Sequence, residues 1–183
     1  MSEIRVTLPL DEPTAISLRA GDLVRLNGLL YTARDAAHKR LIAALERGET
    51  SPIPHVDQVI YYVGPSPAKE GQVIGAAGPT TSGRMDPYTL PLLKLGVRGF
   101  IGKGFRSAEI KAALVEHQAV YLAAVGGAAA LLARHVVQNR IVAYPGLGPE
   151  AIRELIVEEF PVIVVNDCHG GDAYEAGRAQ YAA

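Results

Sequence analysis

A ten-residue run of the sequence, Ala77 to Asp86 (AGPTTSGRMD), places the hydroxyls of Thr80, Thr81 and Ser82 close to the guanidinium of Arg84. Hydroxyl groups and an arginine fork are groups that hold a carboxylate through several hydrogen bonds. A turn that leads into a helix explains the hydroxyls, because Ser and Thr side chains commonly bind free backbone donors. Such a turn does not call for a guanidinium. The run is therefore a candidate site for an anion, and a carboxylate fits its chemistry.

Two further cations occupy comparable positions. Lys103 stands between two glycines, directly after a strand expected at 99–101, so we expect it at the same sheet edge as Thr80 and Arg84. Arg34 stands at the expected start of a helix, where the helix dipole disfavours a cation by about 0.3–1 kcal/mol. A carboxylate bound between these cations would remove that conflict. A lone lysine in a turn is usually only solvated, so this grouping depends on the fold.

Another turn, Gly146-Leu147-Gly148, resembles the dinucleotide-binding pattern, because a strand is expected before it and Ala151 stands at the third small position. However, Pro149 occupies the phosphate-facing turn, and few residues remain for the rest of a dinucleotide fold. The Lys103 turn is not a P-loop either, since a glycine stands where that loop has the Ser or Thr that binds magnesium. A nucleotide-binding module is thus a lower-ranked alternative.

Composition and charge exclude several classes of function. The chain has 18 Lys and Arg against 19 Asp and Glu, a net charge of −1, so it lacks the basic field that draws nucleic acid or an acidic membrane. The single cysteine, Cys168, excludes an internal disulfide and cannot hold a zinc ion or an iron–sulfur cluster by itself. No apolar run approaches the roughly 18 residues that span a membrane, and no export signal is visible. We expect a cytoplasmic protein.

The elements that position these residues follow an α/β pattern. Strands are expected at 4–8, 23–26, 59–63, 99–101, 120–125, 141–144 and 162–165, and helices at 34–48, 86–96, after Ser107 and at 127–136. Strands that alternate with helices predict a central, mostly parallel sheet with flanking helices in a single domain, residues 1–183.

Some local details of this pattern are less regular. Asn27-Gly28 suggests a hairpin-type turn, and Thr32 with Asp35 three residues later suggests a helix capping box. The stretch 151–160 fits a helix or a strand. The tail, residues 167–183, receives no function, and its Gly-Gly pair suggests mobility.

Four segments carry a resemblance to a known family: RDAAH (34–38), GPTTSGRMD (78–86), GFIGKG (99–104) and YPG (144–146). Together they resemble the iron–sulfur hydro-lyases, and most closely the beta subunit, or carboxy-terminal domain, of class I fumarase and L(+)-tartrate dehydratase. The resemblance extends from about Thr7 to Val165. The GPTTSGRMD run is its specific part, because a GKG turn alone is common.

The resemblance implies a swivelling β/β/α domain and a reversible dehydration of a 2-hydroxy dicarboxylate. The reaction is malate to fumarate, a step of the tricarboxylic acid cycle, or tartrate to oxaloacetate. It also implies an alpha-subunit partner that holds a [4Fe–4S] cluster with one iron free for substrate, in a higher hetero-oligomer. This chain then binds no cluster and is inactive alone, which agrees with its single cysteine.

The resemblance further implies roles for particular residues. The implied catalytic residues are Thr80 (as a base), Arg84 and Lys103, and the implied substrate-binding residues are Arg34, Thr81, Ser82 and Gly102. An alkyl hydroxyl is too weakly acidic to act as a base without nearby cations or a proton relay. Thr80 therefore either acts as the base with such help, or orients the substrate for a base on the alpha subunit. A non-catalytic domain that grips small anions is the alternative from a different class.

Overall fold

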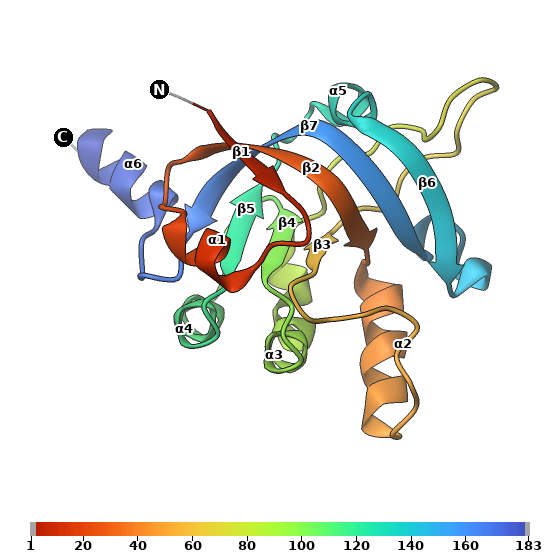
Figure 1. Cartoon of the computed structure of the whole chain (residues 1–183), viewed down its shortest axis with the longest axis horizontal. Helices are drawn as coiled ribbons and strands as arrows, with labels where there is room; N and C mark the ends of the chain where they lie inside the picture. Colours follow the sequence, from red (N-terminus) through yellow and green to blue (C-terminus); the bar gives the residue numbers. More distant parts are fainter. Residues whose placement is uncertain (1–2, 182–183) are drawn as a thin grey trace.

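The computed structural model describes residues 3–181 and contains one mixed sheet with strand order β1-β2-β3-β4-β5-β7-β6 (Figure 1). The strands are β1 (Ile4–Thr7), β2 (Leu23–Thr32), β3 (Val59–Tyr61), β4 (Gly99–Gly102), β5 (Val120–Ala123), β6 (Val136–Ala143) and β7 (Ile152–Asn166). Neighbours from β1 through β5 pair in parallel. The predicted α/β class with parallel pairing is therefore confirmed for these strands.

The long strand β7 changes the shape of the sheet. It runs antiparallel to β5 and β6 and also pairs with β2 along most of its length. The β2–β7 pairing closes β2, β3, β4, β5 and β7 into a five-stranded barrel, with β1 and β6 outside the closed part. Closure removes two sheet edges that would otherwise need protection.

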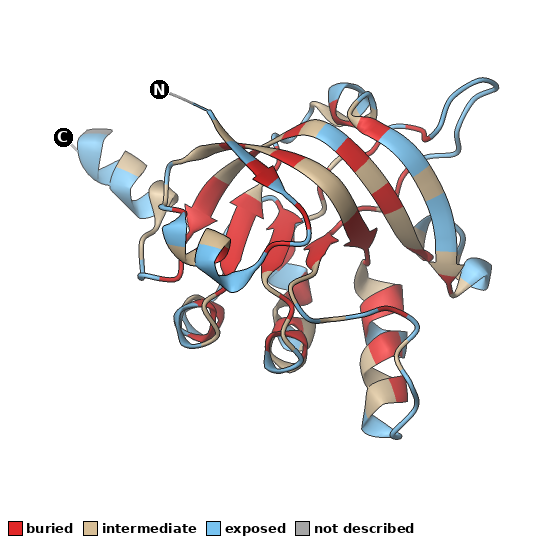
Figure 2. Ribbon diagram, in the orientation of Figure 1, coloured by how far each residue is buried: buried red, intermediate tan, exposed pale blue. Residues whose placement is uncertain are grey.

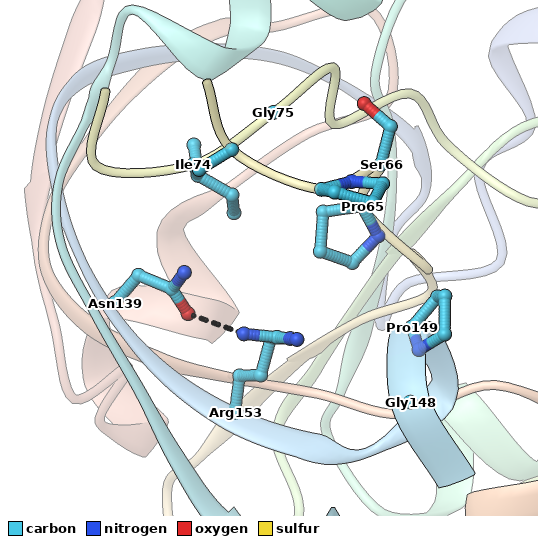
Figure 3. Close-up of a pocket in the computed structure, with 10 residues that line it drawn as sticks. Pro65, Ser66, Ile74, Gly75, Asn139, Gly148, Pro149 and Arg153 are labelled. Carbon is cyan, nitrogen blue, oxygen red and sulfur yellow. Dashed lines mark hydrogen bonds between the residues drawn. The ribbon is translucent and has the colours of Figure 1, made fainter. Parts of the chain in front are cut away.

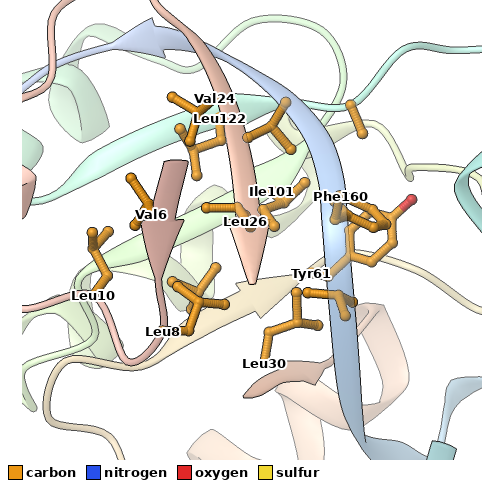
Figure 4. Close-up of a cluster of buried hydrophobic side chains, with 14 of the residues drawn as sticks. Val6, Leu8, Leu10, Val24, Leu26, Leu30, Tyr61, Ile101, Leu122 and Phe160 are labelled. Carbon is orange, nitrogen blue, oxygen red and sulfur yellow. The ribbon is translucent and has the colours of Figure 1, made fainter. Parts of the chain in front are cut away.

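Two apolar clusters hold this arrangement together. One fills the barrel and its open end with side chains such as Leu26, Tyr61, Ile101 and Phe160 (Figure 4). The other lies between the strands and the helices, as the red inner faces of those helices show in Figure 2. Both faces of the central strands are thus buried, which explains why their sequences are continuous apolar runs and not alternating ones.

Three helices cover one face of the sheet: α2 (Asp35–Glu46), α3 (Asp86–Lys94) and α4 (Ala108–Glu116) (Figure 1). The helix expected after Ser107 is α4, and the Ser107 hydroxyl caps it by accepting from the backbone N–H of Ile110. Gly48 and Gly96 follow the helices α2 and α3 with positive φ, as expected of glycines that end helices. The remaining helices are α1 (Glu12–Ser17), α5 (Ala129–Ala133) and α6 (Ala173–Tyr181).

The first thirty residues differ from their prediction. Helix α1 was not expected, and it connects β1 to β2 so that the two strands pair in parallel, not as a hairpin. Strand β2 continues through Asn27 and Gly28, so no turn forms there. Gly28 has a φ of +117° at a register shift against β7, and a Cβ on it would lie 2.9 Å from the carbonyl oxygen of Leu8. The glycine therefore permits a bulge and a close backbone approach.

The predicted capping box is also wrong. Thr32 is the last residue of β2, and its hydroxyl accepts from the backbone N–H of Arg153 at 3.0 Å. Helix α2 instead starts after Arg34, which makes no side-chain cap. One of its free donors is met by Glu150, whose carboxylate accepts from the backbone N–H of Ala36 at 2.9 Å. A capping group from another segment cannot be identified from local sequence spacing.

The ambiguous stretch 151–160 is strand, as part of β7. The predicted helix at 127–136 is shorter, because β6 already begins at Val136. Residues 64–79, called the arm below, form no strand although 73–76 is an apolar run. The arm extends beyond the sheet on the side of β6 and returns to the end of β3 (Figure 1).

The predicted tail is folded over the residues that the structure describes. The Asp167 carboxylate accepts from the backbone N–H groups of Ala20, His169 and Gly171 at 2.8–2.9 Å. Lys111 of α4 pairs with Asp172 and with Glu175 of α6, both at 2.6 Å. The expectation of a mobile tail is therefore not supported for residues 167–181. Residues 1–2 and 182–183 of the predicted single domain lie outside the described part.

Candidate functional site

The run from Ala77 to Asp86, called the hydroxyl run below, lies at the carboxyl ends of β3 and β4. The backbone N–H of Thr80 donates to the carbonyl of Tyr62 at 2.7 Å, and the N–H of Lys103 donates to the carbonyl of Thr80 at 3.1 Å. Ser82 N–H then donates to the carbonyl of Lys103 at 2.8 Å. The main chain of Thr80 and Thr81 thus continues the sheet between two strand ends. The predicted neighbourhood of Thr80 and Lys103 is confirmed.

Arg84 stands on a short 3₁₀ helix, Ser82–Met85, and reaches across to the start of α2. Its Nε donates to Asp35 Oδ1 at 3.0 Å and its Nη2 to Asp35 Oδ2 at 2.7 Å, a bidentate pair. Arg34 lies beside the same carboxylate, with 3.9 Å between its Nη2 and Asp35 Oδ2, and 3.7 Å between its Nη2 and Glu150 Oε1. The two predicted arginines are therefore brought together around one acidic residue.

Most of the candidate side chains are accessible to solvent. The Arg84 side chain is 53% exposed and that of Arg34 is 25% exposed. Thr81 and Lys103 are exposed and Thr80 is half-buried. The aliphatic stem of Lys103 passes over Gly126 in the turn after β5, where an added Cβ would lie 3.7 Å from Lys103 Cδ. Three cations and two threonines thus share one end of the sheet, open to solvent.

Ser82 and Gly102 occupy a different position from the other predicted residues. Ser82 is fully buried, and its hydroxyl donates to the phenol oxygen of Tyr121 at 2.9 Å, which itself donates to the carbonyl of Gly104 at 2.9 Å. A Cβ on Gly102 would overlap the Ser82 hydroxyl and lie 3.1 Å from the carbonyl oxygen of Thr80. Both residues hold the run in place from below, and neither presents a group to solvent.

Sequence reasoning missed a buried arginine beneath the site. Arg106 forms an ion pair with Asp86 at 2.8 Å, and its side chain is 0% exposed. It also donates to the hydroxyls of Tyr62 and Thr89, and its guanidinium lies between the rings of Tyr62 and Tyr121 at 5.5 and 5.3 Å from their centroids. It thereby ties the turn after β4 to the start of α3. The signal in the sequence is Asp86 itself, which was interpreted only as a helix start.

His38 supports the backbone of Arg34. The ring is fully buried against Tyr62 and Tyr88, and its Nδ1 lies 2.9 Å from the carbonyl oxygen of Arg34. Burial lowers the pKa of His38 to about 4, and the nearby cation Arg106 contributes to that shift. The ring is therefore neutral at neutral pH, with its proton on Nδ1 to donate to that carbonyl. His38 therefore has a packing role at the site.

The residues present in this chain do not fit a resident iron–sulfur cluster. Cys168 is buried, its Sγ lies 3.9 Å from the carbonyl oxygen of Ala15, and burial raises the pKa of its thiol. It follows the end of β7 that pairs near Tyr121, whereas the candidate site lies at the opposite ends of β4 and β5. Within residues 3–181, no three His, Cys, Asp or Glu side chains gather as a metal site would require.

The glycine-rich turn does not form a dinucleotide site. Gly146 and Gly148 lie in a 3₁₀ segment, Pro145–Glu150, that leads into strand β7. The dinucleotide pattern requires a helix whose N-terminus faces the phosphates, and a strand cannot supply it. Separately, no helix in the described part of the chain is long and apolar enough to cross a membrane.

Comparison with known proteins decides the family. The sequence model described as "Fumarase C-terminus" matches residues 2–177. The chain belongs to the fumarase C-terminus family. The relatives that this chain matches fall into two groups, one of proteins much longer than this chain and one of similar length.

The longer relatives match this chain over only a part of their own length. The aerobic class I fumarate hydratase of Salmonella typhimurium is 40% identical over 152 residues, which cover 82% of this chain and 26% of that protein. The putative class I fumarate hydratase of Geobacillus stearothermophilus is 38% identical over 177 residues, 94% of this chain and 34% of that protein. The chain therefore spans well under half the length of these relatives.

One relative is similar in length. The putative L(+)-tartrate dehydratase subunit beta of Methanocaldococcus jannaschii is 41% identical over 164 residues, 86% of this chain and 84% of that protein. A fumarase C-terminus domain thus occurs both inside long fumarate hydratases and as a chain named as a subunit.

Proposed function

We propose that this fumarase C-terminus chain is the beta subunit of a hydro-lyase that reversibly dehydrates a 2-hydroxy dicarboxylate. The observation that carries the proposal is the grouping of Arg34, Arg84 and Lys103 around Thr80 at one open end of the sheet. We call Arg34, Arg84 and Lys103 the carboxylate clamp. Malate to fumarate and tartrate to oxaloacetate both fit it, because these cations recognise carboxylates and not the second hydroxyl of tartrate. The names of the relatives support the same class of reaction.

Arg84 and Arg34 bind the carboxylates of the substrate. The Asp35 carboxylate lies against both guanidiniums and orients them, and with Lys103 the cations at this end of the sheet still outnumber the acidic groups that the arginines contact. Asp35 occupies the Nε and Nη2 side of Arg84, which leaves Nη1 and the second Nη2 hydrogen for a substrate oxygen. The substrate thus binds without breaking the internal pair.

Thr80 acts on the carbon that loses its proton, and Thr81 adds a hydrogen bond to the substrate. Cations nearby lower the pKa of a hydroxyl and stabilise the negative charge that deprotonation develops next to a carboxylate. We assign this role to the ammonium of Lys103, whose backbone N–H donates to the carbonyl of Thr80. Ser82 and Gly102 contribute by fixing the main chain under Thr80.

The cluster chemistry belongs to a partner. Because this chain has one buried thiol, we propose that a cysteine-bearing alpha subunit holds the [4Fe–4S] cluster and covers the open side of the site. The complex is a higher hetero-oligomer in the cytoplasm. The domain swivels as a β/β/α unit against that partner, with the closed barrel as its rigid body.

The alternative function is a domain that binds small anions and does not catalyse a reaction. Such a domain would use the same exposed cations, Arg84 and Lys103, at the open end of the sheet. Co-purification of the native complex, followed by assays with malate, fumarate and tartrate, separates the two. Turnover of one substrate supports the hydro-lyase; binding without turnover by a pure, cluster-loaded complex supports the binding domain and contradicts our proposal.

A further inference from the structure

The glycine-rich turn, Pro145–Glu150, brings a carboxylate to the start of α2. Glu150 is the last residue of this turn. Its Oε2 accepts from the backbone N–H of Ala36 at 2.9 Å, and its Oε1 lies 3.7 Å from Nη2 of Arg34. Glu150 therefore contacts both the helix that begins after Arg34 and the guanidinium of Arg34, which is one of the three cations of the carboxylate clamp.

The contact between Glu150 and Arg34 differs from the pair between Asp35 and Arg84. Arg84 donates to Asp35 at 2.7 and 3.0 Å, whereas Nη2 of Arg34 lies 3.7 Å from Glu150 and 3.9 Å from Asp35. The two longer distances are those of an ion pair and exceed that of a hydrogen bond. The two carboxylates thus attract the guanidinium of Arg34 without accepting its Nη2 hydrogens, which remain available to an oxygen of a ligand.

The arm lies against another side of Arg34. A Cβ on Gly64, the first residue of the arm, would lie 2.8 Å from Nη1 and 3.0 Å from Cδ of Arg34, and 3.4 Å from the carbonyl oxygen of Pro149. The absence of a side chain at Gly64 permits this close approach. Pro65, the next residue of the arm, and Pro149 of the turn line one cavity (Figure 3). Arg34 thus lies between the arm and the turn, with 25% of its side chain exposed.

The turn is fastened to α2 at a second point. Tyr144, directly before the turn, has a φ of +55°, a left-handed conformation that is unfavourable for a large side chain. The guanidinium of Arg40, on α2, lies 4.6 Å from the centroid of the Tyr144 ring. An unfavourable conformation persists only where the surrounding structure holds it. The placement of the turn against α2, and with it the placement of Glu150, is therefore well determined.

We propose that Glu150 is a positioning residue for Arg34. Its charge holds the guanidinium in place, at a distance that leaves the Nη2 hydrogens for a carboxylate of the substrate; this inference rests on the hydro-lyase function proposed above. A helix cap is the simpler role for Glu150, because the backbone N–H of Ala36 needs an acceptor at the start of α2. A cap requires only Oε2, whereas Oε1 lies toward Arg34.

The variant Glu150→Gln separates these two roles. The amide oxygen of glutamine can still accept from the N–H of Ala36, so the cap remains, but the negative charge beside Arg34 is lost. Glu154→Gln is the matched control, because Glu154 is about equally exposed, 20% against 26%, and pairs with Arg140 instead. Glu150→Asp keeps the charge on a shorter side chain and should restore part of what Glu150→Gln loses.

The order of the Arg34 side chain tests the positioning role without any catalytic activity. The probe is the Nε–H signal of Arg34, recorded by NMR on the full chain. We expect a high heteronuclear NOE for this signal in the parent chain and in Glu154→Gln, and a lower NOE with faster proton exchange in Glu150→Gln. An unchanged Arg34 signal in Glu150→Gln would overturn the positioning role, whatever the kinetics.

Kinetics of the assembled complex test what this order contributes to substrate binding. The KM of Glu150→Gln for its dicarboxylate should rise about 2- to 10-fold with a smaller change in kcat, because substrate binding must then order the arginine. A parental KM despite a mobile Arg34 would also overturn the proposal. A parental complex that turns over none of malate, fumarate and tartrate would instead contradict the hydro-lyase function, and the Arg34 signal would still show whether Glu150 orders Arg34.

Discussion

The carboxylate of Asp35 holds the guanidinium of Arg84 by two hydrogen bonds, of 2.7 and 3.0 Å, across 49 residues of sequence. The pair connects the first turn of α2 to the 3₁₀ helix after the hydroxyl run, and it lies partly exposed at the site. Its energetic contribution to folding is small, since exposed ion pairs contribute about 0–1 kcal/mol. Its value is positional, because it orients a long side chain before a substrate binds.

Asp35→Asn should therefore weaken substrate binding more than it slows turnover. Ordering a long side chain costs about 0.5–1.5 kcal/mol, so KM should rise about 2- to 10-fold in the assembled enzyme with a smaller change in kcat. Asp35→Glu, which keeps the charge, should recover part of the loss. Steady-state kinetics of the three complexes provide the measurement; an unchanged KM for the Asn variant would mean that Asp35 does not position Arg84.

Gly102 should tolerate no side chain. An alanine Cβ would overlap the Ser82 hydroxyl and approach Tyr62 Cδ2 at 3.0 Å, so Gly102→Ala should lower the free energy of unfolding by about 1–3 kcal/mol and displace the Thr80 run. Gly146→Ala is the matched control, because nothing lies within 4 Å of the added atom. Urea unfolding of both variants tests this. Equal stability of the two would show that the run has more room than the structure indicates.

His38 should make the folded chain sensitive to acid. Its pKa falls from 6.5 in the unfolded chain to about 4 in the folded one, so the unfolded state binds more protons between these values. Stability should be full above about pH 6.5 and decline as the pH falls toward 4, by about 3 kcal/mol from this residue.

The variant His38→Asn tests that assignment. Asparagine keeps an N–H donor near the position of Nδ1 for the Arg34 carbonyl but does not titrate. The free energy of unfolding of the variant, measured by urea titration from pH 7 to pH 4, should decline less steeply than that of the parent chain. Identical slopes for the two proteins would assign the acid sensitivity to other groups.

The positions of the candidate residues were predictable to the extent that they depend on parallel strands. Lys103 follows β4, and the carboxyl ends of neighbouring parallel strands share one edge. Thr80 reaches the end of β3 only because the arm, which forms no strand, leads the chain back to the carbonyl of Tyr62, and its own preceding apolar run does not explain that position. The Arg84–Asp35 pair was not predictable, because its partners are separated in sequence and no local pattern couples them. Arg106 was missed for the same reason: its ion pair with Asp86 appears only when the turn after β4 packs on α3.

The closed barrel could not be predicted from the sequence, for a different reason. The first part of β7 mixes apolar and charged residues at a spacing that fits a strand or a helix equally well, so only its last part, 162–165, was predicted as a strand. Its pairing with β2 joins residues more than a hundred positions apart, which only the complete fold brings together. The missed helix α1 is short, and six residues give too little periodicity to detect.

The isolated chain should fold but show no hydro-lyase activity. Two continuous apolar clusters stabilise it without a partner, whereas its single buried thiol provides no cradle for a cluster. After anaerobic treatment with iron and sulfide it should remain colourless by visible spectroscopy. Colour and activity should both appear when a cysteine-bearing alpha subunit is added. Hydration of fumarate by the chain alone would contradict the division of labour.

The most direct test of the central claim is the specificity constant of Arg84→Met in the assembled complex. The substitution removes a charge-assisted contact worth about 1.5–3 kcal/mol, so kcat/KM for the dicarboxylate substrate should fall by about 10- to 150-fold while assembly and cluster content remain unchanged. Arg140→Met, an exposed arginine that pairs with Glu154 on the neighbouring strand, should retain parental kinetics. A complex that carries Arg84→Met and turns over its substrate at the parental kcat/KM would show that this chain does not supply the carboxylate clamp.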